Sequence, residues 1–236
     1  MNLTKLNNLQ KTVLVIAGSD PSGGAGIQAD LKTLTSFGVY GMTAITALTE
    51  QNTNGVFDIF EVPIDFVVKQ INCCLSDINA TAVKIGMLHS AELISAVFEA
   101  LNNHNILNNK NINIVLDPVM VAKGGHILLK ENAMDALKNF IKIAQPILTP
   151  NIPEAEVLTG MKINNLKDMK NAGKELVHLG ARHVILKGGH MKTRVMTDLL
   201  INPSEIYSIE TAKIKTNHTH GTGCTMASAL SASLTK

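Results

Sequence analysis

Short apolar runs and helical patterns alternate along most of the chain. Residues 11–17 (KTVLVIA) predict a buried strand, and after a glycine-rich loop Ile27, Leu31 and Leu34 recur at helical spacing. Apolar, β-branched runs predict further strands at residues 43–48, 55–62, 82–85, 111–116, 146–148, 183–186, 197–201 and 205–209. Further helices are expected from Pro63 to about Ser76, around residues 93–101 and 166–179, and over residues 221–234.

This alternation predicts an α/β fold with a mainly parallel central sheet that helices cover on both faces. The length of 236 residues fits one large domain, and we expect residues 1–236 to form it. In such three-layer folds, ligands bind beyond the carboxyl ends of the strands. Polar, glycine-rich segments follow several of the predicted strands, so we expect the functional site at that edge of the sheet.

The composition narrows the class of protein. The net charge is only +2 and the basic residues are scattered, so the sequence has no basic cluster of the kind that binds nucleic acid. The three cysteines, two of them adjacent, do not resemble a disulfide framework, and no apolar run is long enough to span a membrane. We therefore expect a cytoplasmic protein with reduced thiols, and neither nucleic acid nor a membrane as its partner.

The loop of residues 18–26 (GSDPSGGAG) is the first candidate feature. Its four glycines let backbone N–H groups approach a ligand, and the start of the next helix favours anions; a plain strand-to-helix turn is the alternative. Asp30 follows in that helix, where a carboxylate often serves only the helix dipole. Gln51 follows the next strand, and its amide suits a heteroaromatic ring edge. Taken singly, Asp30 and Gln51 also fit structural or solvated roles.

Oxygen-rich and basic side chains follow the later strands. Asp117 can hold Mg²⁺, which prefers few carboxylates plus phosphate oxygens, or it can cap a loop. Asn151 and Glu154 form a second oxygen-rich spot, but their spacing is also a helix-capping pattern. Lys187, which two glycines follow, can reach a phosphate or simply close a strand. Met87 can line an apolar slot or belong to the core.

The sharpest segment is residues 217–225 (NHTHGTGCT). Gly221, Thr222 and Gly223 begin a helix whose first free N–H groups can form an anion hole. Cys224 lies at the same helix start, where a thiol pKa is commonly lowered, and this suits a base or nucleophile. The neighbouring histidines lack partner spacing for a metal, so we expect them to be loop residues.

Together these segments resemble the hydroxymethylpyrimidine and hydroxymethylpyrimidine-phosphate kinases of thiamine biosynthesis, in the ribokinase superfamily. The resemblance runs from Val13 to Leu234. Its seven motifs are IAGSDPSGGAGIQADLKT (16–33), GMTAITALTEQNT (41–53), KIGML (84–88), LDPVMVAKGG (116–125), TPNIPEAE (149–156), LKGGH (186–190) and NHTHGTGCT (217–225). Each motif is weak alone, but their order is specific.

The resemblance implies a role for each candidate residue. Positions that hold the pyrimidine are matched by Gly18, Asp30, Gln51 and Val119, and Met87 is expected to line the same slot. The anion hole is matched by Gly221, Thr222 and Gly223, and Cys224 stands where most ribokinase relatives carry a catalytic Asp. The region that binds ATP phosphates and Mg²⁺ is matched by Asp117, Asn151, Glu154 and Lys187, beside Gly223.

The implied activity is ATP-dependent phosphorylation of 4-amino-5-hydroxymethyl-2-methylpyrimidine and then of its monophosphate, with Mg²⁺ as cofactor and a homodimer as the assembly. The nearest alternative is a pyridoxal or pyridoxine kinase, although Gln51 suits an aminopyrimidine edge better. Another alternative is a pyrimidine- or nucleotide-binding module without turnover. It gains support from the C-terminus, because the family usually continues for several tens of residues beyond the helix that holds Cys224, and those residues complete the adenine pocket. We therefore expect a short C-terminal part and weak nucleotide binding.

Overall fold

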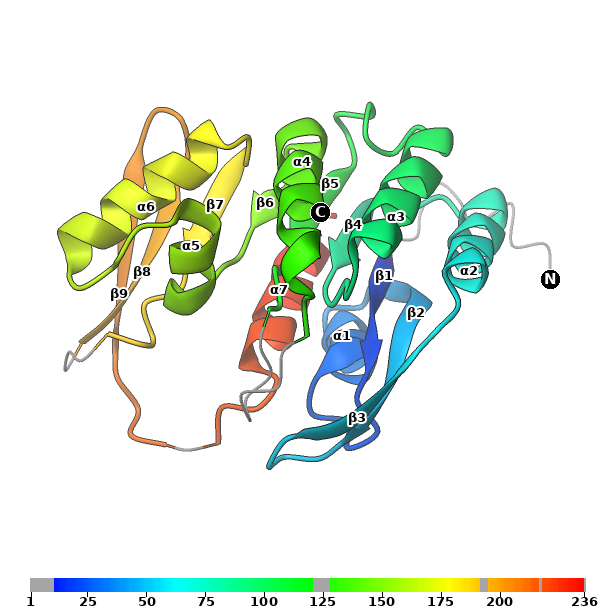
Figure 1. Cartoon of the computed structure of the whole chain (residues 1–236), viewed down its shortest axis with the longest axis horizontal. Coiled ribbons are helices and arrows are strands. Elements are labelled where there is room, and N and C mark those ends of the chain that lie inside the picture. Colours follow the sequence, from blue (N-terminus) through cyan, green and yellow to red (C-terminus); the bar gives the residue numbers. More distant parts are fainter. Residues whose placement is uncertain (1–10, 121–127, 192–194, 217, 236) are drawn as a thin grey trace.

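The structure, a computed structural model, describes residues 11–120, 128–191, 195–216 and 218–235 (Figure 1). The strands are β1 (Thr12–Ser19), β2 (Tyr40–Gln51), β3 (Val56–Glu61), β4 (Ala82–Ile85), β5 (Asn113–Leu116), β6 (Ile147–Leu148), β7 (His183–Leu186), β8 (Val195–Ile201) and β9 (Ile206–Ala212). The helices are α1 (Gly26–Ser36), α2 (Ile64–Asp77), α3 (Ala91–Asn103), α4 (Met134–Ala144), α5 (Ile152–Thr159), α6 (Leu166–His178) and α7 (Thr222–Ser233), with a 3₁₀ turn at Glu131–Ala133.

The strands form one sheet in the order β3-β2-β1-β4-β5-β6-β7-β8-β9. The six strands from β2 to β7 in this order run parallel, whereas β3, β8 and β9 pair antiparallel with their neighbours. The chain leaves β1 for β2 on one side and later returns to β4 on the other side. This reversal creates a topological switch point beside β1, where ligands bind in open α/β sheets.

Helices cover the sheet on both faces, as strand β1 shows. Its Leu14 and Ile16 pack into the large core beneath α2 to α6, while Val13 and Val15 pack against the opposite layer formed by α1 and α7. Helix α7 closes this second layer beside α1, behind the strands in the view of Figure 1. The predicted three-layer α/β fold with a mainly parallel sheet is confirmed.

The sequence pattern predicted some helices and strands with the correct bounds and missed others. The predicted ranges of β4 and β7 agree with the structure, and β2 extends farther in both directions than residues 43–48. Helix α4 was not predicted, although its buried residues Leu137, Phe140, Ile141 and Ala144 have clear helical spacing. Across the described residues, no helix combines the length and the apolar character needed to cross a membrane.

Candidate active site

The carboxyl ends of β5 and β7 and the start of α7 meet at one point. A Cβ placed on Gly223 would lie 3.5 Å from both Asp117 Oδ2 and Lys187 Nζ. Lys187 Nζ donates to Asp117 Oδ1 at 3.1 Å, and the Thr149 hydroxyl donates to the same oxygen at 2.9 Å. The expected anion hole therefore adjoins a buried carboxylate and a lysine. This point can receive a phosphate group.

Asn151 and Glu154 begin α5 as a complete capping box. The Glu154 N–H donates to Asn151 Oδ1 at 2.9 Å, and the Asn151 N–H donates to Glu154 Oε2 at 2.8 Å. Burial of Glu154 and repulsion by Asp117 raise the pKa of the Glu154 carboxyl to about 7. The capping alternative is thus present, yet the same carboxylate also stands in the electric field of Asp117. Adding positive charge there would relieve the repulsion.

No group of three or more His, Cys, Asp or Glu side chains in the described residues is placed to hold a metal ion. The pair Asp117 and Glu154 nevertheless suits Mg²⁺, because this ion commonly takes one or two carboxylates and completes its shell with water and substrate phosphates. The mutual repulsion that raises the pKa of Glu154 is what a bound cation would offset. The donor set therefore fits magnesium together with a phosphate-bearing substrate.

The glycine-rich loop and the anion-hole segment interlock. Gly221 has φ of 75°, and a Cβ there would come within 1.7 Å of the Gly24 carbonyl oxygen. His220 Nε2 lies 2.7 Å from Asp20 Oδ2, and the Asp20 carboxylate also accepts from the N–H groups of Ser22, Gly24 and Ala25. One carboxylate thereby organises both loops.

Asp20 keeps its charge although it is buried. Burial opposes ionisation, but hydrogen bonds from Ser22, His220 and the Ala25 N–H outweigh it and hold the pKa of the Asp20 carboxyl below its ordinary value. Asp20 and His220 were not among the predicted site residues. The signal was their place in the two most glycine-rich motifs, but a partnership across 200 positions of sequence cannot be seen in one chain.

A second buried cluster lies under the start of α7. Lys84 Nζ donates to Asp30 Oδ2 at 2.9 Å, the Ser228 hydroxyl donates to Asp30 Oδ1 at 2.7 Å, and neither charged side chain has exposed surface. Burial raises the pKa of Asp30, against the lowering effect of Lys84. Burial alone would lower the pKa of Lys84. The negative charges of Asp30, Cys224 and Asp117 outweigh burial and raise this pKa above its ordinary value, so Lys84 stays protonated.

The residues expected to form an apolar slot pack together beside the switch point, and we call them the apolar slot. Ala47, Met87 and Leu128 form a small buried cluster, against which the partly buried Ile59 and Val119 pack. A Cβ on Gly18 would lie 3.1 Å from Met87 Sδ, so the glycine lets the chain pass close to this slot.

Comparison with known proteins agrees with this geometry. The family model for phosphomethylpyrimidine kinase matches residues 20–236. The chain belongs to the phosphomethylpyrimidine kinase family. Among its relatives is the hydroxymethylpyrimidine/phosphomethylpyrimidine kinase of Bacillus subtilis strain 168, which is 46% identical over 224 residues, covering 94% of this chain and 81% of the relative.

Two solved structures place the kinase fold in context. The phosphomethylpyrimidine kinase of Clostridium difficile 630 has 43% identity and a TM-score of 0.82, with 96% of this chain and 91% of that chain covered. An ADP complex of Bacillus subtilis pyridoxal kinase has 35% identity and a TM-score of 0.86, with 96% and 84% covered. The fold is thus shared by phosphomethylpyrimidine and pyridoxal kinases, and a kinase of this family uses ATP as its phosphate donor.

Asp30 was expected to contact the pyrimidine; its carboxylate is enclosed and both oxygens are bonded to protein, and the contact stays a prediction. One expectation for this phosphomethylpyrimidine kinase family member needs correction. Cys224 was expected to have a lowered thiol pKa at the helix start. Burial instead raises the pKa of the Cys224 thiol, with Asp30 and Asp117 adding to the rise and Lys84 opposing it.

The other candidates occupy different parts of the site. Val119 and Met87 line the apolar slot, and Gln51 ends β2, with its amide within reach of the Thr49 hydroxyl. Thr222 is the first residue of α7, and its hydroxyl donates to the Thr219 carbonyl oxygen at 3.0 Å. Residues 121–125 of the LDPVMVAKGG motif and Asn217 of the last motif lie outside the described residues.

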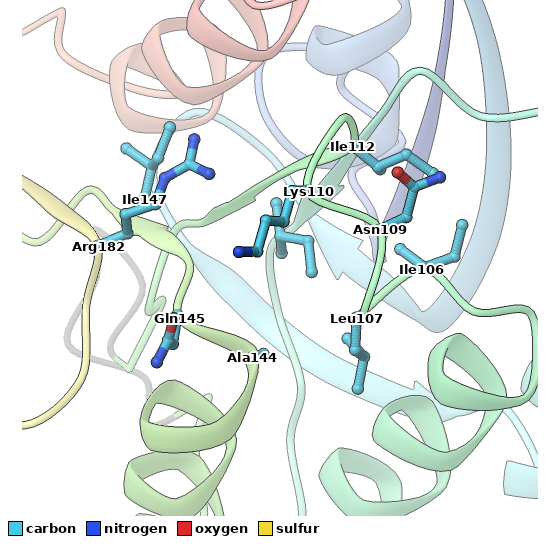
Figure 2. Close-up of a pocket in the computed structure, with 10 residues that line it drawn as sticks. Ile106, Leu107, Asn109, Lys110, Ile112, Ala144, Gln145, Ile147 and Arg182 are labelled. Atoms are coloured by element: carbon cyan, nitrogen blue, oxygen red, sulfur yellow. The ribbon is translucent and has the colours of Figure 1, made fainter.

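A separate small cavity of about 80 Å³ lies away from these residues (Figure 2). Ile112, Ile147 and Arg182, at or just before the amino-terminal ends of β5, β6 and β7, contribute to its wall. It therefore belongs to the edge of the sheet opposite the phosphate region. None of the candidate site residues lines it.

Proposed function

We propose that this chain transfers a phosphoryl group from ATP to the hydroxymethyl oxygen of 4-amino-5-hydroxymethyl-2-methylpyrimidine, and then a second one to the monophosphate, in thiamine biosynthesis. The single observation that carries the proposal is the meeting of Gly223, Asp117 and Lys187 at the end of the parallel strands. Phosphoryl transfer needs positioning and charge stabilisation more than covalent chemistry. This arrangement offers both.

The residues around the transferred group have distinct roles in this proposal. The N–H groups of residues 221–223 at the start of α7 point their positive ends at the phosphoryl oxygens, as helix starts do for anions. Lys187 adds a positive charge at the same point. The interlocked Gly221 and Gly24 hold the N–H groups in place before substrate arrives, so no reorganisation is required during transfer.

Cys224 is the proposed general base for the first transfer. Its sulfur takes the proton from the hydroxymethyl group as the oxygen attacks phosphorus. Since burial raises the pKa of the thiol, only a minority is thiolate near neutral pH, and the rate of the first transfer should rise with pH as the thiolate fraction grows. The second acceptor is already an anion, so its transfer should depend less on Cys224.

Asp117 and Glu154 are the proposed holders of Mg²⁺. When bound, the ion supplies positive charge to the phosphate oxygens of the nucleotide. Asn151 keeps the Glu154 carboxylate at the start of α5 through the capping box, and Lys187 offsets the charge of Asp117 when the ion is absent. The site is therefore stable both with Mg²⁺ bound and without it.

Pyridoxal kinase remains the second candidate, because several structural neighbours are pyridoxal kinases. It is not favoured, since the matching family model is for phosphomethylpyrimidine kinase and the Bacillus subtilis relative quoted above is a hydroxymethylpyrimidine/phosphomethylpyrimidine kinase. In the site, the amide of Gln51 supports the same preference. A module without turnover is not favoured either, since Lys187, Cys224 and the start of α7 are all present.

We further propose that residues 1–236 act as one kinase domain, with support from the single sheet that runs through all nine described strands.

A homodimer is proposed on a different observation. Leu48 and Phe60 are cross-strand partners on β2 and β3, and both are exposed, at 47% and 66%. Exposed apolar pairs on an edge hairpin favour association with a second copy. Analytical ultracentrifugation of the wild type and Phe60→Ser tests it, since only the wild type should sediment as a dimer.

The test of the function is a steady-state ATP-consumption assay with hydroxymethylpyrimidine, its monophosphate and pyridoxal side by side. We expect kcat/KM for hydroxymethylpyrimidine to exceed that for pyridoxal by about tenfold or more, the scale of one hydrogen bond to the Gln51 amide. Lys187→Met should lower turnover of both pyrimidines. Preferential use of pyridoxal would overturn the proposal.

A further inference from the structure

Thr49 stands between the end of β1 and the amide of Gln51. Its Oγ1 lies 2.7 Å from the backbone carbonyl oxygen of Ser19 and 3.0 Å from Gln51 Oε1. Thr49 also faces the apolar slot, because it is the cross-strand partner of Ile59, which packs against Ala47 and Met87 there. Its hydroxyl can therefore determine which end of the Gln51 amide, the oxygen or the nitrogen, faces a ligand.

The hydroxyl of Thr49 has one proton, and two oxygens compete for it, the Ser19 carbonyl oxygen and Gln51 Oε1. The Ser19 carbonyl oxygen carries no proton, so a contact of 2.7 Å is favourable only if Thr49 donates to it. After that donation, Thr49 Oγ1 can only accept. An amide oxygen 3.0 Å away would then face a second acceptor, whereas an amide nitrogen would donate. A half turn about the last side-chain bond of Gln51 exchanges the two groups.

Ser19, whose carbonyl oxygen accepts from Thr49, is itself held by a neighbouring side chain. The Gln28 amide donates to Ser19 Oγ at 2.7 Å, and the Asp20 N–H donates to Gln28 Oε1 at 2.8 Å. Asp20 is in turn fixed by His220. These bonds hold Ser19 in place, and with it the backbone carbonyl oxygen to which Thr49 donates.

We propose that Thr49 is a specificity-positioning residue, which holds Gln51 with its amide nitrogen toward Thr49 and its carbonyl oxygen toward the ligand. The inference rests on the proposed role of Gln51 in pyrimidine recognition. An outward carbonyl oxygen accepts from the exocyclic amino group of an aminopyrimidine. A ring that carries an oxo group at that position brings a second acceptor, and Gln51 can rotate to meet it only by breaking its bond to Thr49.

The test compares two acceptors, 4-amino- and 4-oxo-5-hydroxymethyl-2-methylpyrimidine, as substrates of the wild type, Thr49→Val and Thr49→Ser. In Thr49→Val the amide is free to rotate, so the ratio of kcat/KM for the amino over the oxo compound should fall about tenfold, the size of one hydrogen bond. The change should appear in KM, with kcat within about twofold. Thr49→Ser keeps the hydroxyl and should restore the wild-type ratio.

The matched control is Thr159→Val at the end of α5. Thr159 is also half-buried, and its hydroxyl also donates to a backbone carbonyl oxygen, that of Ala155, at 2.7 Å. It should leave the ratio unchanged, which separates amide orientation from the general loss of a hydroxyl. An unchanged ratio in Thr49→Val, or a ratio in Thr49→Ser that matches Thr49→Val, would overturn the proposal.

Gln51→Ala separates this inference from the proposed function. If Gln51→Ala lowers the ratio but Thr49→Val does not, Gln51 recognises the ring and Thr49 does not orient it, so the inference fails alone. If Gln51→Ala leaves the ratio unchanged, the proposed recognition by Gln51 is wrong, and the role of Thr49 is wrong with it. If the wild type phosphorylates neither pyrimidine, the proposed function itself has failed.

Discussion

The ion pair of Lys84 and Asp30 makes the sharpest prediction about stability. Its Nζ to Oδ2 distance is 2.9 Å, and neither side chain has exposed surface. At an effective dielectric of about 20, such a pair attracts by about 6 kcal/mol, and desolvation of both groups takes back much of this. Removing one partner leaves the other charge buried alone. We therefore expect Lys84→Met to lower the free energy of unfolding by ~3–5 kcal/mol.

The surface pair of Lys69 and Asp65 provides a matched control. Its nitrogen-to-oxygen distance is 2.8 Å, nearly the same, but the two side chains are 69% and 68% exposed. Lys69→Met should cost less than about 1 kcal/mol, because solvent screens an exposed pair. Urea unfolding followed by circular dichroism measures both variants. The double variant Lys84→Met with Asp30→Asn should regain much of the loss, since it removes the orphaned charge.

The pH dependence of Lys84→Met has a definite sign. Without Lys84, burial raises the pKa of Asp30 still further above its value in the unfolded chain. Between these two pKa values the folded state holds a proton that the unfolded state has lost. Stability of the variant should therefore fall as pH rises, by up to about 1.4 kcal/mol per pH unit. The reasoning is refuted if Lys84→Met costs no more than Lys69→Met, or if its stability rises with pH across this window.

Three further predictions concern the site. Gly221→Ala should abolish transfer in the kinase assay, because its Cβ would come within 1.7 Å of the Gly24 carbonyl oxygen; full activity would contradict the interlocked loops. Iodoacetamide at pH 7 should modify the exposed Cys73 before Cys224, whose thiol has a raised pKa. Cys224→Ala should slow the first transfer by about 10²–10⁴, and an unchanged rate would make Cys224 a packing residue. Asp20→Asn should cost ~1–3 kcal/mol in urea unfolding at pH 7. The deficit should shrink as pH falls from the ordinary pKa of an Asp carboxyl, about 3.9, through the lower pKa that Asp20 has in the folded state; a deficit independent of pH would argue against the charge.

Much of the fold could be predicted because local pattern and final environment agree. Strands β4 and β7 are short apolar runs that become buried parallel strands, and the order of strands and helices already implies three layers. The exceptions are two helices. The apolar spacing of α4 was present, but it follows a glycine-containing stretch without a start signal, and α5 was indicated only by the capping pattern of Asn151 and Glu154. The sheet order could not be predicted, because it depends on which strands pair across long separations.

The site was less predictable because its electrostatics come from partners distant in sequence. The bonds that Lys84 and Ser228 make to Asp30 could not be predicted, because both residues arrive from other elements. The helix start suggested a lowered pKa for Cys224, but burial raises the pKa of this thiol by more than Lys84 and the Gly26 hydrogen bond lower it. Local motifs therefore indicate where a site lies, while burial and charge pairing decide what each group does.

The central claim is that this chain phosphorylates hydroxymethylpyrimidine twice, and ³¹P NMR of the reaction mixture tests it most directly. With ATP, Mg²⁺ and hydroxymethylpyrimidine, we expect a phosphomonoester signal of the pyrimidine to rise first. The paired signals of a diphosphate ester should then replace it, while ADP accumulates. Release of inorganic phosphate without either pyrimidine ester, under conditions where the folded enzyme binds ATP, would contradict the account.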